Sequence, residues 1–396
     1  MKVIQFGLRF SPNLGDGIIA DCIDFGVRAL RPGAEVCRID LSGREASGAV
    51  TVRNRSAVLR VLKVLPLFLR QAIVQWKLGR MLDEAAPRWA AIVQGADLAL
   101  LGGGQLFADA DLNFCLKVAR AAEILQAAGV PLVVYGVGVS KGWTRRGAEL
   151  FRAVLQADLR QVGVRDELSR MAWQAQMAGL GPEPVLTRDP GLLAAQCYGA
   201  ATDAGGRVGL CITAPEILAY HADAGVGGTG GLAFYAGLAR ALCDTGERVM
   251  LFTNGAEEDR AALDRLCVLP EIEARIATGH VSIAAPSARP EDLARQIGGY
   301  RAVVAHRLHA CIVAWSYGCP IVGLGWDRKV QSFFASVQAD GFFSDAPDIG
   351  GAAVAAMVAA AIAAGVDATL HAEVLAETWA GLDGALGVLT ARPAEA

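Results

Sequence analysis

The stretch Ala302–Leu324, "AVVAHRLHACIVAWSYGCPIVGL", predicts the fold of this chain. A short apolar strand leads into a polar turn, then into a helical run that ends at Gly318, and then into a second apolar strand after Pro320. Strand, helix and strand at this spacing form a βαβ unit of a parallel sheet. The turn at His306–His309 therefore follows the carboxyl end of a strand, where open parallel sheets bind their ligands.

The same alternation continues on both sides of this stretch and predicts an α/β fold with two doubly wound, Rossmann-like domains. Small and turn-forming residues at Gln196–Gly206 predict a boundary. We expect an N-terminal domain at 1–200, a C-terminal domain at 201–375 and a helix or tail at 376–396, with alanine-rich helix from about Ile349 onward. The further strand-length runs are Lys2–Phe6, Leu98–Leu101, Leu132–Tyr135, Gln161–Val164, Val208–Ile212 and Val249–Phe252.

Composition limits the possible functions. Among 396 residues, 53% are hydrophobic and 19% charged, which indicates a packed interior. The net charge of −3 gives no general attraction to nucleic acid, so we expect no nucleic-acid partner. Nine cysteines without a C-x-x-C pair or a neighbouring histidine cluster predict neither disulfides nor a metal site. The sequence shows no signal peptide and no spanning segment, so we expect a cytoplasmic protein.

One segment suggests contact with a membrane surface. Residues 53–80, "RNRSAVLRVLKVLPLFLRQAIVQWKLGR", hold seven basic residues and no acidic one. Arg60, Lys63, Arg70 and Lys77 share one side of a helix, which Pro66 is expected to kink or divide. A domain helix with a basic solvated face and a helix lying on an anionic membrane both fit this pattern.

Two further loops follow predicted strands. In "SPNLGDGIIAD", Asn13 and Asp16 stand between the first strand and a helix, as an ordinary helix-capping turn or as polar groups at the mouth of a cleft. In "DLALLGGGQLFAD", a buried strand runs into Gly102, Gly103 and Gly104. Three glycines indicate unusual dihedral angles or close approach by a ligand, but the phosphate-loop lysine and the G-x-G-x-x-G spacing are absent.

The turn "HRLH" is the strongest candidate site. Histidine near a core is more often structural than catalytic. Here two of the chain's five histidines flank an arginine and Leu308 at a strand's carboxyl end, which favours function. Backbone N–H groups at the start of the following helix, together with Arg307, form an expected anion pocket. We expect one histidine to take part in chemistry and the other to support it.

Six segments in order resemble the polysaccharide pyruvyl transferases over roughly residues 5 to 335. This chain has "YGVGVSKGW" where that family has a G-x-S-x-G-P-like stretch, so the role of Tyr135–Gly142 is open. The six segments are "NLGDG" (Asn13–Gly17), "LGGGQLF" (Leu101–Phe107), "VGVRDELS" (Val162–Ser169), "RDPGLL" (Arg188–Leu193), "HRLHA" (His306–Ala310) and "GCPIVGLGWDRKVQSFF" (Gly318–Phe334).

The resemblance implies a fold like the B-type glycosyltransferases, with the acceptor on the N-terminal domain and the donor on the C-terminal one. It implies transfer of a pyruvyl group from phosphoenolpyruvate to a sugar of a cell-surface polysaccharide (exopolysaccharide) or its lipid-linked precursor, with no cofactor. Arg307, Leu308 and His309 would contact the donor, helped by Arg165.

From the chemistry, His309 is the best general acid, because histidine titrates near neutral pH. Arg188 is a further candidate to hold the donor's anionic groups beside Arg307 and Arg165, and Asp16 is a candidate base for a sugar hydroxyl. Two alternatives remain: a nucleotide-sugar glycosyltransferase of the same architecture, and a non-catalytic glycan-binding member of the family.

Overall fold

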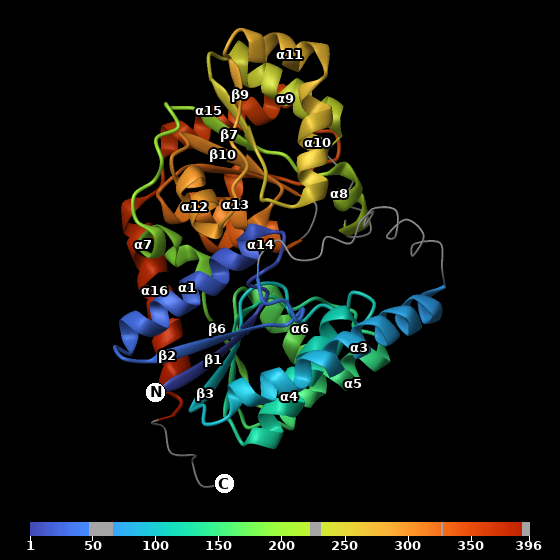
Figure 1. Cartoon of the computed structure of the whole chain (residues 1–396). Coiled ribbons are helices and arrows are strands. Elements are labelled where there is room, and N and C mark those ends of the chain that lie inside the picture. Colours follow the sequence, from blue (N-terminus) through green and yellow to red (C-terminus); the bar gives the residue numbers. More distant parts are fainter. Residues whose placement is uncertain (47–65, 222–230, 326–327, 390–396) are drawn as a thin grey trace. The chain divides into compact units, whose positions relative to one another are not determined.

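The computed structural model describes residues 1–46, 66–221, 231–325 and 328–389. Within these ranges the chain forms two compact units, each built on a parallel six-stranded sheet flanked by helices (Figure 1). The expected α/β fold with two doubly wound domains is confirmed. Unit 1 contains the described parts of Met1–Ser11, Ile19–Pro190 and the chain from Ala376 onward, and unit 2 contains those of Pro12–Ile18 and Gly191–Leu375.

The sheet of unit 1 has a reversal of strand order next to its first strand. Its order is β2-β1-β3-β4-β5-β6, so successive strands are added outward from either side of the β1/β3 junction. In open parallel sheets, ligands commonly bind at such a reversal, beyond the carboxyl ends of the two strands. The strands are β1 (Lys2–Gly7), β2 (Glu35–Asp40), β3 (Leu98–Gly102), β4 (Leu132–Val137), β5 (Leu159–Val164) and β6 (Pro184–Leu186).

Helices cover both faces of this sheet because its central strands are apolar on both sides. Leu82 and Trp89 of α3, Val118 of α4 and Trp173 of α6 are buried in the core on one face. Ile23 of α1, with Leu382 and Leu386 of α16, is buried on the other. The helices that begin or lie in this unit are α3 (Leu67–Val93), α4 (Asn113–Ala128), α5 (Arg145–Phe151), the short η1 (Arg152–Leu155) and α6 (Glu167–Met177), joined by parts of α1 (Leu14–Leu30) and α16 (Ala368–Gly387).

The sheet of unit 2 has the order β12-β11-β10-β7-β8-β9, with its reversal between β7 and β10. The strands are β7 (Val208–Cys211), β8 (Val249–Phe252), β9 (Val281–Ile283), β10 (Ala302–Ala305), β11 (Ile321–Leu324) and β12 (Phe343–Ser344). The helices are η2 (Pro190–Leu193), α7 (Ala194–Tyr198), α8 (Pro215–His221), α9 (Leu232–Asp244), α10 (Glu257–Cys267), α11 (Pro270–Ala277), α12 (Pro290–Gly298), α13 (Leu308–Ser316), α14 (Arg328–Ser336), η3 (Asp340–Phe342) and α15 (Gly351–Ala364).

In the part of the chain that the structure describes, no single helix has both the length and the apolar composition needed to cross a membrane. Only α15 and α16 taken together, as a pair sharply bent at the break between them, satisfy such a test, and they do so by length and composition alone. Val354 and Val358 of α15 are buried in the core of unit 2, as expected for a helix of a packed domain.

Candidate functional site

The turn "HRLH" lies at the strand-order reversal of unit 2. It follows β10 and begins α13, while β7 is the neighbouring central strand. Leu308 is 4% exposed and packs at the start of α13, so its side chain anchors the turn. The structure confirms the expected position of this motif at the carboxyl end of a strand.

His306 is fully buried and makes a polar contact inside unit 2. Its Nδ1 lies 3.0 Å from the hydroxyl of Tyr235, and that hydroxyl accepts a hydrogen bond from the backbone N–H of Thr213 at 3.1 Å. The Thr213 N–H, the Tyr235 hydroxyl and Nδ1 of His306 all have a hydrogen-bond partner when the hydroxyl donates to Nδ1 of a neutral imidazole. Burial raises the pKa of Tyr235, which keeps the phenol protonated as this donor. His306 is thereby suited to a supporting role.

Arg307 forms a buried ion pair with Asp259 of α10. Its Nε and Nη2 donate to one carboxylate oxygen at 3.0 and 2.6 Å, and the backbone N–H of Ala214 donates to the other at 2.9 Å. Burial raises the pKa of Asp259, whereas the charge of Arg307 and these donors act to lower it. Three donors around one carboxylate favour the ionised pair. The charge of Arg307 is therefore largely balanced, and the pair fixes the direction of its guanidinium.

His309 is partly exposed and packs against the first loop of the chain. A Cβ on Gly15 would lie 2.7 Å from Cβ and 2.8 Å from Nδ1 of His309, so only glycine fits there without displacing the ring. The loop is tied to unit 2 by a hydrogen bond from the backbone N–H of Leu14 to the carbonyl of Asn254, at 2.9 Å. The structure thus brings "NLGDG" and "HRLH", almost 300 residues apart in sequence, into contact.

Asn13 and Asp16 stand at the start of α1. The side-chain carbonyl of Asn13 accepts from the backbone N–H of Gly15 at 3.4 Å, and Asp16 lies in the first helical turn. A carboxylate in the first turn stabilises a helix through its dipole. Both side chains belong to the same loop that touches His309, so Asp16 remains a candidate base near this histidine.

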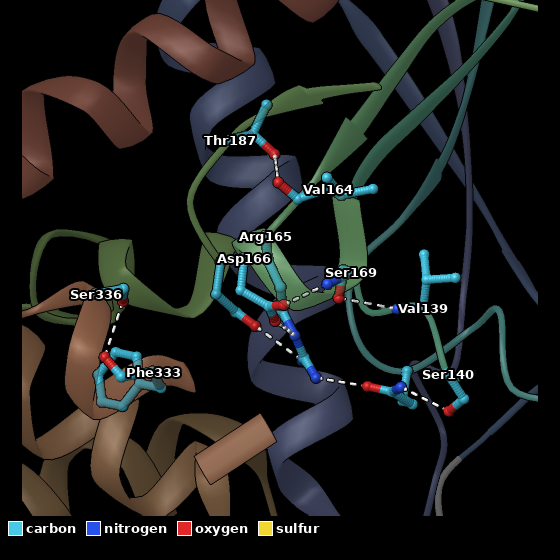
Figure 2. A network of polar contacts seen from close by, with 11 residues as sticks. Val139, Ser140, Val164, Arg165, Asp166, Ser169, Thr187, Phe333 and Ser336 are labelled. Atoms are coloured by element: carbon cyan, nitrogen blue, oxygen red, sulfur yellow. Dashed lines mark hydrogen bonds and ion pairs between the residues drawn. The ribbon is translucent and has the colours of Figure 1, made fainter. Parts of the chain in front are cut away.

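Arg165 is the centre of a buried polar network in unit 1 (Figure 2). Its side chain is 4% exposed, and its Nη2 donates to Gln105 at 2.7 Å. It also forms ion pairs with Asp189 at 3.3 Å and Asp166 at 3.5 Å. These contacts join the loops that leave β3, β5 and β6, so Arg165 organises the carboxyl edge of this sheet.

Asp166 and Ser169 extend this network to β4. Asp166 caps α6 by accepting from the backbone N–H of Ser169 at 2.7 Å, and the Ser169 hydroxyl accepts from the N–H of Val139 at 3.0 Å (Figure 2). Ser140 accepts from the side-chain amide of Gln105 at 2.9 Å. The stretch Tyr135–Gly142, which departs from the family pattern, is therefore built into the Arg165 network.

The glycine run after β3 is explained by packing against α1. A Cβ on Gly103, whose φ is +76°, would lie 1.9 Å from Cγ2 of Ile19, and one on Gly102 would lie 3.0 Å from the carbonyl of Tyr135. Gly104 also has a positive φ of 73°. Glycine is needed here for dihedral angles and for the close approach of a helix. This geometry accounts for the glycines by packing alone and does not support their predicted role in binding substrate.

Arg188 is partly exposed and pairs with Glu377 of α16, also in unit 1, at 2.7 Å. The candidate residues therefore fall into two groups. Arg165, Arg188 and the glycine run belong to unit 1, and the first-loop residues, His306, Arg307 and His309 belong to unit 2.

Unit 1 also contains a cavity at the carboxyl ends of β1 and β2. Its volume is about 320 Å³, near the lower end of the range for small-molecule pockets. Asp40 and Trp89 lie in its wall, and Asp40 accepts from the backbone N–H of Phe10 at 2.8 Å. Three basic side chains of the wall are paired with acidic groups: Arg9 with Asp21, Arg38 with Asp24 and Arg88 with Glu45.

The sequence did not reveal several polar partners at the unit 2 site. Asp259 and Tyr235 contact the "HRLH" turn from 48 and 71 residues away, so no local motif links them to it. Thr213 follows β7 and Asn254 follows β8. A polar residue directly after a buried strand is a signal from which these two could have been predicted as site residues. Among the described residues, no group of three or more His, Cys, Asp or Glu side chains is placed to hold a metal ion.

Comparisons with solved structures agree with the two-unit fold. The chain is similar to S. aureus MnaA in its UDP co-structure, with 12% identity, 100% and 99% of the two chains covered and a TM-score of 0.51. It is also similar to Methanocaldococcus jannaschii UDP-GlcNAc 2-epimerase in complex with UDP-GlcNAc and UDP, with 10% identity, 91% and 92% covered and a TM-score of 0.50. At these identities the likeness shows the fold alone.

A heptosyltransferase matches as well. E. coli ADP-heptose lipopolysaccharide heptosyltransferase II matches with 16% identity, 92% and 99% of the two chains covered and a TM-score of 0.42. The two parallel six-stranded sheets themselves confirm the expected architecture of two Rossmann-like domains.

Comparison with protein families shows more than the fold, because it identifies a family for this chain. No curated protein matches the sequence. The model of the polysaccharide pyruvyl transferases matches residues 13–328, which include the "NLGDG" loop, the Arg165 network and the "HRLH" turn. The chain therefore belongs to the polysaccharide pyruvyl transferase family.

Proposed function

We propose that this protein transfers the pyruvyl group of phosphoenolpyruvate to two hydroxyls of one sugar, forming a pyruvate ketal on a cell-surface polysaccharide or its lipid-linked precursor. Family membership supports transferase activity. One observation carries the catalytic assignment. His309, partly exposed beside the strand-order reversal of unit 2, has its ring packed against Gly15 at the start of α1, while buried His306 supports the turn.

The proposed reaction needs an acid, a base and a site for anions. Protonated His309 gives its proton to the methylene carbon of the donor, which becomes a methyl group and leaves an electrophilic centre at the adjacent carbon. One sugar hydroxyl adds there and loses its proton, phosphate departs with the C–O bond electrons, and the second hydroxyl adds and loses its proton. The products are the ketal and inorganic phosphate.

Binding of the anionic donor is assigned to unit 2. The first backbone N–H groups of α13 favour an anion, and protonated His309 adds a positive charge. Arg307 contributes less net charge than its sequence position suggested, because Asp259 balances it. Its ion pair with α10 instead orients the turn on which His309 stands.

We assign the sugar acceptor to the cavity of unit 1. Partly exposed Phe10 suits the apolar face of a sugar ring, and the arginine and carboxylate groups suit its hydroxyls. We also propose a cytoplasmic location, as expected from the sequence.

Substitution of His309 tests the proposal. His309→Gln removes the acid but keeps a similar size, so phosphate release from phosphoenolpyruvate and acceptor should fall by roughly 10²–10⁴-fold with little change in KM. His280, exposed on the same unit and bonded to Thr278, provides the matched control His280→Gln, which should retain full activity.

A second arm compares donors. Phosphoenolpyruvate should protect the protein against thermal unfolding, whereas a nucleotide sugar should not. The reverse result would favour the nucleotide-sugar glycosyltransferase. Normal turnover by His309→Gln would remove this histidine from the mechanism, and binding of glycan without phosphate release would favour a non-catalytic member of the family.

A further inference from the structure

The first half of α3 exposes a row of large apolar side chains. Leu69, Ile73 and Trp76 are 40%, 44% and 67% exposed, and their spacing puts them on one side of the helix. An exposed tryptophan grouped with two aliphatic side chains is more informative than isolated surface leucines.

The same helix is anchored to unit 1 through its second half. Leu82, Ala85 and Trp89 are at most 5% exposed and lie in the core beneath α3, which runs beside α4 (Figure 1). The exposed row is therefore not the core-facing side of the helix. It is presented by a helix that the rest of unit 1 holds in place.

Basic groups accompany the apolar row. Lys77 is exposed, and the guanidinium carbon of exposed Arg80 lies 5.9 Å from the ring centroid of Trp76. The sequence has no acidic residue from Pro66 to Leu82. We call Leu69, Ile73, Trp76, Lys77 and Arg80 the exposed α3 face.

This face differs from the basic face expected from the sequence alone. Arg60 and Lys63 lie outside the described residues. Arg70 is 24% exposed and forms an ion pair with Asp111 at 3.5 Å, so its charge is directed toward unit 1. The sequence pattern pointed to a face of basic residues, whereas the structure shows a face that also exposes the apolar side chains of Leu69, Ile73 and Trp76.

We propose that the exposed α3 face binds an anionic phospholipid bilayer, with the helix lying in the plane of the interface. The aliphatic side chains would enter the acyl boundary, the Trp76 ring suits the headgroup level, and Lys77 and Arg80 would contact lipid phosphates. A second copy of the chain suits this face less well, because a two-fold contact places these positive charges opposite each other. The proposal does not depend on the identity of the donor.

Co-sedimentation with vesicles tests the proposal. The full chain should sediment with vesicles of phosphatidylglycerol and phosphatidylcholine, and much less with phosphatidylcholine alone. Lys77→Gln/Arg80→Gln should weaken binding by roughly 30-fold, about fivefold per basic residue, and added salt should reduce the difference. Ile73→Ser/Trp76→Ser should abolish binding at any salt concentration.

Matched variants control for charge and hydrophobicity elsewhere. Arg145→Gln/Arg146→Gln removes two exposed charges from the same unit, and Val268→Ser removes an apolar side chain that is 72% exposed. Neither should change vesicle binding. Trp76→Phe should keep binding but lose the blue shift of tryptophan emission on vesicle addition. Thermal melts establish that each variant is folded.

Four results would overturn the proposal. The parent protein sediments with neither vesicle, or equally with both, or the α3 and control variants lose binding alike. If Ile73→Ser/Trp76→Ser instead lowers the molecular mass in solution, a second copy covers this face. Because phosphate release is measured with a soluble acceptor, failure of membrane binding is distinguishable from failure of the proposed reaction.

Discussion

At the residue scale, the ion pair of Arg307 and Asp259 is the main polar support of the turn after β10. Asp259 is fully buried and Arg307 is 14% exposed, so loss of one partner leaves a charge with little access to water. Asp259→Asn keeps the shape but removes the charge. We expect it to lower the free energy of unfolding by about 3–5 kcal/mol, as measured by urea denaturation.

The same variant tests whether the pair also orients the site. If it does, Asp259→Asn should raise the KM for phosphoenolpyruvate under conditions where the protein is fully folded. Glu149→Gln breaks an exposed ion pair with Arg145 and should change neither stability nor KM appreciably. A destabilised Asp259→Asn enzyme with an unchanged KM would restrict the pair to a structural role.

Gly15 controls the position of His309. Gly15→Ala places a methyl group within 2.7 Å of the histidine side chain, so either the ring or the loop must move. We expect kcat to fall by at least tenfold, because a general acid must lie within hydrogen-bond reach of its target. Gly237→Ala, in a helix where a Cβ meets nothing within 4 Å, should leave kcat unchanged. An unaltered kcat for Gly15→Ala would show that the reaction does not depend on this packing.

Local motifs predicted the position of the "HRLH" turn but not what surrounds it. The strand, turn and helix could be recognised because hydrophobic pattern and glycine placement are local properties. Asp259 and Tyr235 were not predicted, because side-chain partners separated by 48 and 71 residues are set by how strands are ordered in the sheet. Whether the named residues bind the donor is still a prediction.

At the scale of elements, all eight predicted strands are present, and the strands within the described residues that the sequence did not predict are β2, β6, β9 and β12. These four are the edge strands of the two sheets. A central parallel strand is covered on both faces and reads as an apolar run, whereas β2 has the sequence "EVCRID" and is only partly buried. Hydrophobic runs therefore detect the centre of such a sheet better than its edges.

The contact of α1 with the end of β3 depends on Gly103. A methyl group there would lie 1.9 Å from Ile19, and φ of +76° is itself unfavourable for alanine. Because Gly103→Ala would both overpack this contact and strain the backbone, we expect it to lower the free energy of unfolding by roughly 2–4 kcal/mol. Gly79→Ala, in α3 with no atom within 4 Å of the added Cβ, serves as the control and should be neutral or stabilising. A neutral Gly103→Ala would favour the ligand-binding interpretation of this glycine.

At the scale of the whole molecule, unit 1 is built from segments far apart in the chain. Its sheet is formed by residues before Pro190, yet α16 from Ala376 onward covers one face. The hydroxyl of Tyr135 in β4 donates to the carbonyl of Thr378 at 3.4 Å, and Leu382 lies in the same core. The sequence predicted helix in this region and allowed the tail to pack back across the N-terminal domain, which α16 does. The contact itself could not be derived, because an alanine-rich helix carries little information about which surface it covers.

Leu382 tests whether α16 is an integral part of unit 1. The side chain is 0% exposed among β3, β4 and α1, so Leu382→Ala should leave a cavity and lower the free energy of unfolding by about 2–5 kcal/mol. Leu389, just after the same helix, is 40% exposed, and Leu389→Ala should have little effect. Hydrogen exchange should show the loss of protection in β1, β3 and β4 rather than in α16 alone, because removing the cover of a shared core weakens every strand that packs on it. If protection is lost in α16 alone, the rest of unit 1 is stable without this helix.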